Sequence, residues 1–251
     1  MFNNKTVATL MFTALLGASN LSGAEMVKNI VLVHGAFTDG SSWSEVTERL
    51  QQKGFHVTSV QNPLTSLADD VTATERVLAR QHGDVLLVGH SWAGAVVTQA
   101  GNASRVRGIV YLSALVPDSG ESVSGLLTRL GAPMGGMEAD KNGLIWLDNP
   151  ADFRRVMAGD VPEEKVKLLT ASQQPISASA FDGLVSHAAW KEKPTWYLMT
   201  KDDRALPYPV QQKIVKMTGS VTEQISSSHM SMISHPAEVA TFIERAARSF
   251  K

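Results

Sequence analysis

The sequence of 251 residues contains no cysteine. Disulfides, thiolate metal sites, iron–sulfur clusters and a cysteine nucleophile are therefore excluded. It also lacks an excess of charge, because 23 Lys and Arg against 24 Asp and Glu leave a net charge of −1. A dedicated nucleic-acid binder usually carries a basic excess, so that class is not expected. No HExxH motif or other cluster of metal ligands occurs, and neither a metal nor a cofactor is expected.

Long apolar runs are absent except at the N-terminus. Residues 1–5 are weakly basic, residues 6–21 are uncharged and mostly apolar, and small residues follow at 22–24. This pattern predicts a signal peptide of residues 1–24, cleaved after Ala24. A membrane anchor needs about 20 strongly apolar residues, whereas Thr, Ser, Asn and Gly interrupt this stretch. The mature protein is expected to be periplasmic or secreted, without a stable membrane anchor.

The remaining residues, 25–251, are predicted to form one domain. The chain is 43% apolar and 19% charged, which excludes a disordered protein. Short apolar runs alternate with helical patterns, an arrangement that predicts an α/β fold with a mostly parallel sheet and helices on both faces. About six strands are expected, at 29–34, 55–60, 84–89, 106–113, 195–200 and 221–225. The alternation stops after residue 117, where a helical cap insertion without strands is expected at about 118–190.

A strand-to-helix turn at residues 88–94 (VGHSWAG) carries the first chemical signal. Small residues stand two positions before and after Ser91, at Gly89 and Ala93, as a sharp nucleophile elbow requires. Such a turn lifts the serine hydroxyl above the sheet and aims the next backbone N–H, that of Trp92, at the same point. The alternative is an ordinary βα turn with a helix-capping serine. Its place between an apolar strand and a helix favours Ser91 as a nucleophile.

A nucleophilic serine needs a base and an acid that orients the base. In the order nucleophile, acid, histidine, His229 and His235 both follow the last strand, and His229 is favoured because it lies in the loop before the final helix. Asp202 and Asp203 both follow the fifth strand. Asp203 is the better match to the usual acid loop, and Asp202 is the alternative.

Two backbone N–H groups are candidates for an oxyanion hole. The first strand ends at His34-Gly35-Ala36 and should neighbour the strand that leads to Ser91. The N–H of Ala36 is therefore expected to join that of Trp92 in binding developing negative charge.

The chain resembles the α/β-hydrolases over nearly all of its predicted mature length. The stretches that carry the resemblance are VLVHGAFTDGSSW, VGHSWAGAVV, YLSALVPDSGES, DDRALP and SSHMSMISHP. They are most similar to the plant methyl-ester esterase and hydroxynitrile lyase group and its bacterial esterase-like relatives. The resemblance implies Ser91 as nucleophile, His229 as base, Asp203 as its orienting acid, oxyanion N–H groups at Ala36 and Trp92, and a cap after residue 117. Trp92 and Ala93 depart from the commoner Leu and Gly.

Four functions fit these residues to different degrees. The leading expectation is a serine hydrolase that cleaves small carboxylic esters through an acyl-enzyme. Lactone hydrolysis uses the same residues and is not distinguished by sequence. The lyases that the chain resembles carry Thr and Lys at the positions of Gly35 and Met230, so a hydroxynitrile lyase is less expected. A non-catalytic ligand-binding protein is the fourth candidate. Apolar cap residues suggest an apolar pocket wall or packing of the cap, at Leu126, Leu127, Leu130, Met134, Met137, Trp146, Leu147 and Met157.

Overall fold

A six-stranded parallel sheet forms the centre of the protein. The computed structural model describes residues 26–250, so the predicted signal peptide lies outside the described residues. The strands run in the order β2-β1-β3-β4-β7-β8, and each neighbouring pair is parallel. Their bounds are β1 (Asn29–Val33), β2 (His56–Val60), β3 (Val85–His90), β4 (Val106–Leu112), β7 (Thr195–Thr200) and β8 (Val221–Ile225). The predicted fold class is confirmed.

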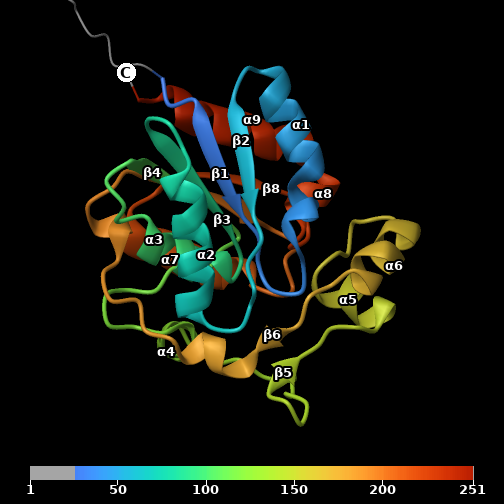
Figure 1. Ribbon diagram of the computed structural model, residues 1–251. Helices are drawn as coiled ribbons and strands as arrows, with labels where there is room; N and C mark the ends of the chain where they lie inside the picture. Colours follow the sequence, from blue (N-terminus) through green and yellow to red (C-terminus); the bar gives the residue numbers. More distant parts are fainter. Residues whose placement is uncertain (1–25, 251) are drawn as a thin grey trace, which may run out of the picture.

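The central strands are apolar because helices cover both faces of the sheet. On one face α1 (Ser44–Gln52), which follows the 3-10 turn η1 (Gly40–Trp43), packs against α9 (Pro236–Arg248). On the other face α2 (Leu67–Ala79) packs against α3 (Ala93–Ala100), as Figure 1 shows. α7 (Tyr208–Thr218) packs on β7 and ends at Gly219, which has a left-handed backbone. All residues of β3 are buried, whereas β8 at the sheet edge is mostly exposed.

The segment between β4 and β7 runs along the end of the sheet at which the strands finish (Figure 1). We call residues 118–190 the cap. It contains α4 (Val123–Arg129), α5 (Pro150–Val156), α6 (Glu163–Ala171) and the 3-10 turn η2 (Ala178–Asp182), and the 3-10 turn η3 (Ala189–Lys191) begins at its end. It also contains two strands, β5 (Leu144–Ile145) and β6 (Ile176–Ser177), paired antiparallel. The expectation that this segment has no strand is therefore wrong, because two-residue strands are too short to show a period in sequence.

Two smaller features complete the fold. A short helix, α8 (Ser231–Ser234), lies between β8 and α9 and was not predicted. No helix within residues 26–250 has both the length and the apolar character needed to cross a membrane.

Candidate active site

The turn between β3 and α3 holds Ser91 in a strained backbone conformation. Its φ is 54°, in the left-handed region that side-chain-bearing residues rarely adopt. A Cβ at Gly89 would lie 2.6 Å from a methyl group of Val97 and 2.8 Å from the carbonyl oxygen of Ala93. Only glycine therefore fits two positions before the serine, as a sharp elbow requires.

Ser91 begins a chain of two hydrogen bonds between residues from three loops. The Nε2 atom of His229 lies 2.7 Å from the Ser91 hydroxyl, and its Nδ1 atom lies 2.7 Å from a carboxylate oxygen of Asp203. Ser91 follows β3, Asp203 follows β7 and His229 follows β8. Since a carboxylate only accepts hydrogen bonds, Nδ1 carries the proton and Nε2 is free to accept from Ser91.

Asp203 is fixed by other donors as well as by His229. The Thr200 hydroxyl donates to it over 2.7 Å, and the backbone N–H groups of Ala205 and Leu206 donate over 2.9 and 2.7 Å. The carboxylate is buried. These bonds set its direction, so it can hold the His229 ring in one orientation.

The alternative acid and base lie elsewhere. The Asp202 side chain is exposed, and its backbone N–H donates to the Ser227 carbonyl. The Nδ1 atom of His235 lies 2.9 Å from the Ser234 hydroxyl and 3.6 Å from Asp160. The structure thus brings Asp203 and His229 to Ser91, and not Asp202 or His235.

The two expected oxyanion donors border the same cavity as Ser91. Within residues 26–250, the backbone N–H groups of Ala36 and Trp92 donate no hydrogen bond. The turn after β1 approaches the elbow so closely that a Cβ at Gly35 would lie 2.8 Å from the Ser91 Cβ atom. Both N–H groups are therefore available beside the serine hydroxyl.

A buried carboxylate behind Trp92 was missed in the sequence. The indole Nε1–H of Trp92 donates to Asp70 over 2.7 Å, and the Leu64 N–H donates to the other oxygen of Asp70 over 2.8 Å. Burial raises the pKa of Asp70 to about 6, although both hydrogen bonds oppose the rise. The sequence marks the burial of Asp70 only by its position, because it lies on the same face of the helix as the apolar residues Leu67 and Leu78.

A cavity of about 660 Å³ opens in front of Ser91 and is largely apolar. The cap residues Leu127, Met134, Met137, Trp146, Leu147 and Met157 line it, as expected for a pocket wall, whereas Leu126 and Leu130 are buried outside it. From the other side it is lined by Phe37, Trp92, Leu115 and Leu206. Charged side chains also border it, at Glu138, Asp152, Arg155 and Arg204.

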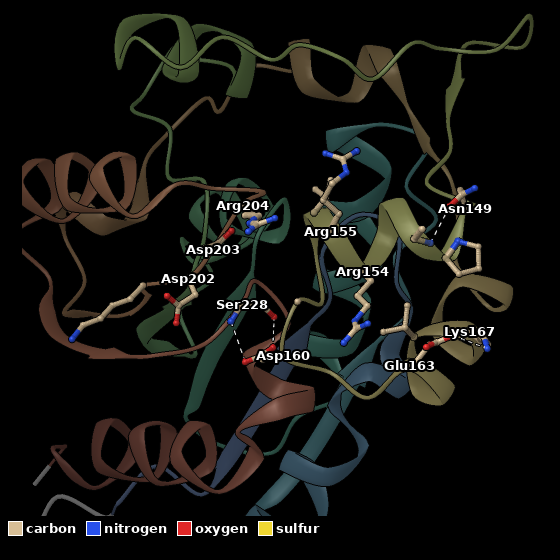
Figure 2. A pocket seen from close by; sticks show the side chains of 16 residues that line it. Asn149, Arg154, Arg155, Asp160, Glu163, Lys167, Asp202, Asp203, Arg204 and Ser228 are labelled. Atoms are coloured by element: carbon tan, nitrogen blue, oxygen red, sulfur yellow. Dashed lines mark hydrogen bonds and ion pairs between the residues drawn. The ribbon is translucent and has the colours of Figure 1, made fainter.

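A second, larger cavity of about 1160 Å³ lies between the cap and the loops that follow β7 and β8 (Figure 2). It contains neither Ser91 nor His229, and it adjoins the first cavity at Arg155, Val156 and Arg204. Its walls are charged, with Arg154, Asp160 and Lys167 among them. Within residues 26–250 no three His, Asp or Glu side chains are placed to hold a metal ion.

Known proteins resemble this chain in sequence and in fold. A carbendazim-hydrolysing esterase from Nocardioides sp. (strain SG-4G) is 31% identical over 153 residues, which is 52% of this chain and 63% of that protein. A methylesterase from Arabidopsis thaliana is 26% identical over 259 residues, covering 89% of this chain and 96% of that protein. A pyrethroid hydrolase structure from Sphingobium faniae JZ-2 has a TM-score of 0.76 and 22% identity, with 88% of this chain and 97% of that one covered.

The model of the alpha/beta hydrolase family matches residues 30–242. This span includes Ser91, Asp203 and His229. The resemblance seen in the sequence motifs is confirmed, and the chain belongs to the alpha/beta hydrolase family.

Proposed function

We propose that the protein is a serine hydrolase that cleaves small carboxylic esters through an acyl-enzyme intermediate. One observation carries the proposal: the serine at the strained elbow, the buried imidazole and the buried carboxylate are joined by two hydrogen bonds of 2.7 Å. This arrangement activates a serine hydroxyl for attack on a carbonyl carbon. The esterase names of the relatives agree with it.

Each residue has a defined role in the proposed reaction. The Ser91 oxygen attacks the ester carbonyl while His229 Nε2 takes its proton. The N–H groups of Ala36 and Trp92 bind the oxyanion of the tetrahedral intermediate. His229 then returns the proton to the leaving alcohol, and the acyl group stays on Ser91.

A water molecule completes the cycle. His229 takes a proton from the water as its oxygen attacks the acyl carbon. Collapse of the second tetrahedral intermediate releases the carboxylic acid and returns the proton to Ser91. The reaction needs no cofactor, and Asp203 stabilises the imidazolium in both halves.

The cavity in front of Ser91 favours substrates with an apolar group. Its volume of about 660 Å³ lies in the range typical of small-molecule sites. The methionines of its cap wall have flexible side chains that adapt to different shapes. We therefore propose esters of moderate size with an apolar acyl or alcohol part.

Lactone hydrolysis is the second candidate, because a lactone is an internal ester and reacts with the same three residues. The lyase reaction is disfavoured at two positions. Met230 is fully buried where the lyases carry a lysine, and a side chain at Gly35 would collide with Ser91. The hydrogen-bond chain also argues against a protein that only binds ligands.

A substrate panel tests the proposed function. p-Nitrophenyl esters of increasing acyl length, aliphatic lactones and mandelonitrile are offered to the wild type and to Ser91→Ala. We expect serine-dependent ester hydrolysis and no release of cyanide. Efficient cyanide release, or no turnover of any ester or lactone, would contradict the proposal.

We also propose that the protein is exported to the periplasm or the medium. The support is the apolar stretch of residues 6–21 followed by small residues at 22–24. The absence of cysteine makes the fold insensitive to an oxidising compartment.

A further inference from the structure

The loop that carries His229 is held by the cap on both sides of the histidine. We call residues 226–230 the base loop and residues 157–160 the cap turn. The backbone N–H of Ser228 donates to a carboxylate oxygen of Asp160 over 3.1 Å. The backbone N–H of Met230 donates to the carbonyl oxygen of Met157 over 3.1 Å. The residues immediately before and after His229 therefore both bond to the cap turn.

The bond to Ser228 is made by the side chain of Asp160, whereas the bond to Met230 is made by the backbone of Met157. The second carboxylate oxygen of Asp160 accepts from the Ser228 hydroxyl, and Figure 2 shows both bonds between the two residues. Burial raises the pKa of Asp160, but hydrogen bonds from Ser228, Ser234 and Ser227 outweigh burial and leave the pKa below its usual value. The carboxylate is thus a firmly held acceptor, although its side chain is 30% exposed.

The core of the protein holds the carbonyl ends of the same two peptide groups. The Ser227 carbonyl accepts from the Asp202 N–H over 3.0 Å. The His229 carbonyl lies 3.0 Å from Nε2 of His90. In the described part of the chain, the N–H groups of Ser228 and Met230 have no acceptor besides the cap turn. The peptide groups 227–228 and 229–230 are therefore each held by the core through the carbonyl and by the cap turn through the N–H.

From this geometry we infer that Asp160 is a positioning residue that keeps Nε2 of His229 in line with the Ser91 hydroxyl. The inference rests on the proposed function, because it takes His229 as the base. A shift of about 1 Å in a reacting group can cost about 100-fold in rate. Asp160 borders the larger cavity and not the cavity in front of Ser91, so it acts through His229 rather than on the substrate.

This role predicts a particular kinetic signature. Removing the carboxylate should lower kcat while leaving KM for a small ester nearly unchanged, because the substrate cavity keeps its lining. Replacement by asparagine should restore much of the loss, since its side-chain oxygen can still accept from the Ser228 N–H.

The experiment compares Asp160→Ala, Asp160→Asn and the control Asp148→Asn with the wild type. Asp148 is an exposed carboxylate of the cap that borders neither cavity. Active sites are first counted with a fluorophosphonate, so that kcat refers to folded, reactive enzyme. We expect Asp160→Ala to lower kcat by about 10- to 100-fold with KM within about twofold of wild type. The kcat of Asp160→Asn should lie between those of Asp160→Ala and the wild type. The kcat of the control should match that of the wild type.

Several outcomes would overturn the inference. They are a wild-type kcat in Asp160→Ala, an effect confined to KM, an equal loss in the control, or unfolding of both Asp160 variants by circular dichroism. The last would assign Asp160 to stability alone. An inactive wild type that is unlabelled at Ser91 would overturn the proposed function, and the inference with it. An active wild type with unaffected Asp160 variants would overturn the inference alone.

Discussion

The left-handed backbone of Ser91 places its hydroxyl 2.7 Å from His229. Replacing Ser91 by alanine removes the proposed nucleophile and leaves the backbone free to keep its turn. We expect ester turnover to fall by about a million-fold, as in triad enzymes that lose the serine. Initial rates with a p-nitrophenyl ester measure the loss, and circular dichroism verifies the fold.

Covalent labelling supplies an independent control for this residue. A fluorophosphonate should modify Ser91 in the wild type, and peptide mass spectrometry should find no other labelled serine. A folded Ser91→Ala protein with near-wild-type turnover would remove Ser91 as the nucleophile.

Asp203 and Asp202 differ in burial and in contact with His229, so equivalent changes should have unequal effects. Asp203→Asn should lower kcat by about 10,000-fold, because the imidazole then settles in the wrong tautomer. Asp202→Asn should cost far less, since its side chain is exposed. Kinetics of both variants under identical conditions make the comparison, and the reverse ranking would move the acid to Asp202. Mild effects of both variants would point instead to Asp118 after β4, whose side chain is ion-paired with Lys191.

The buried carboxylate of Asp70 makes stability depend on pH. Burial raises the pKa of Asp70 to about 6, whereas an unfolded carboxyl titrates near 3.9. The folded state therefore holds the proton more tightly. The stability gained from protonated Asp70 is complete below about pH 4 and is lost as the pH rises through about 6, by about 3 kcal/mol.

Asp70→Asn tests this dependence, because an amide stays neutral. Its side chain places an NH2 group against one N–H donor, a cost that does not change with pH. Denaturant unfolding of both proteins between about pH 4 and 7 should show the wild type losing stability relative to the variant as the pH rises. If the unfolding free energies of the two proteins changed in parallel with pH, Asp70 would not titrate in this range.

At the scale of elements, the closest approach in the site is between the turn after β1 and the elbow after β3. A Cβ at Gly35 would lie 2.8 Å from the Ser91 Cβ and 2.9 Å from the His90 carbonyl. Gly35→Ala should push the elbow away, with a loss of about 100-fold in kcat and about 1–3 kcal/mol of stability. Rates and thermal melts measure both effects.

Gly125 in α4 is the matched control for Gly35. A Cβ there would meet its nearest neighbour at 3.4 Å, and alanine favours a helix over glycine. Gly125→Ala should keep the rate and the stability. If Gly35→Ala also kept the wild-type rate and stability, the turn after β1 would tolerate a side chain.

The elements were largely predictable from the sequence, whereas some contacts were not. Each of the six sheet strands lies within one or two residues of its expected range. Buried apolar runs such as β1 and β3 are characteristic of parallel strands. Ser91, Asp203 and His229 were predicted from motifs next to these strands. Asp160 was missed because its contact with Ser228 joins residues 68 positions apart, and no local pattern marks such a pair.

At the scale of the whole molecule, export should shorten the chain. The signal-peptide hypothesis predicts cleavage after Ala24, so the protein recovered from the periplasm or the medium should begin at Glu25. Intact-mass measurement of the recovered protein checks this directly. A chain that keeps residues 1–24 and sediments with membranes would instead indicate an anchor.

The cap leaves the sheet after β4 and returns to it at β7, and these two strands are hydrogen-bonded neighbours, with Leu112 beside Leu198. During evolution the whole insertion could therefore be exchanged for another without breaking any strand pairing of the six-stranded sheet. Such an exchange would give the same chemistry a new substrate range. The exchange would succeed only if the incoming segment supplied hydrogen-bond acceptors for the N–H groups of Ser228 and Met230, on either side of His229. Recombination should therefore favour incoming segments that carry both acceptors.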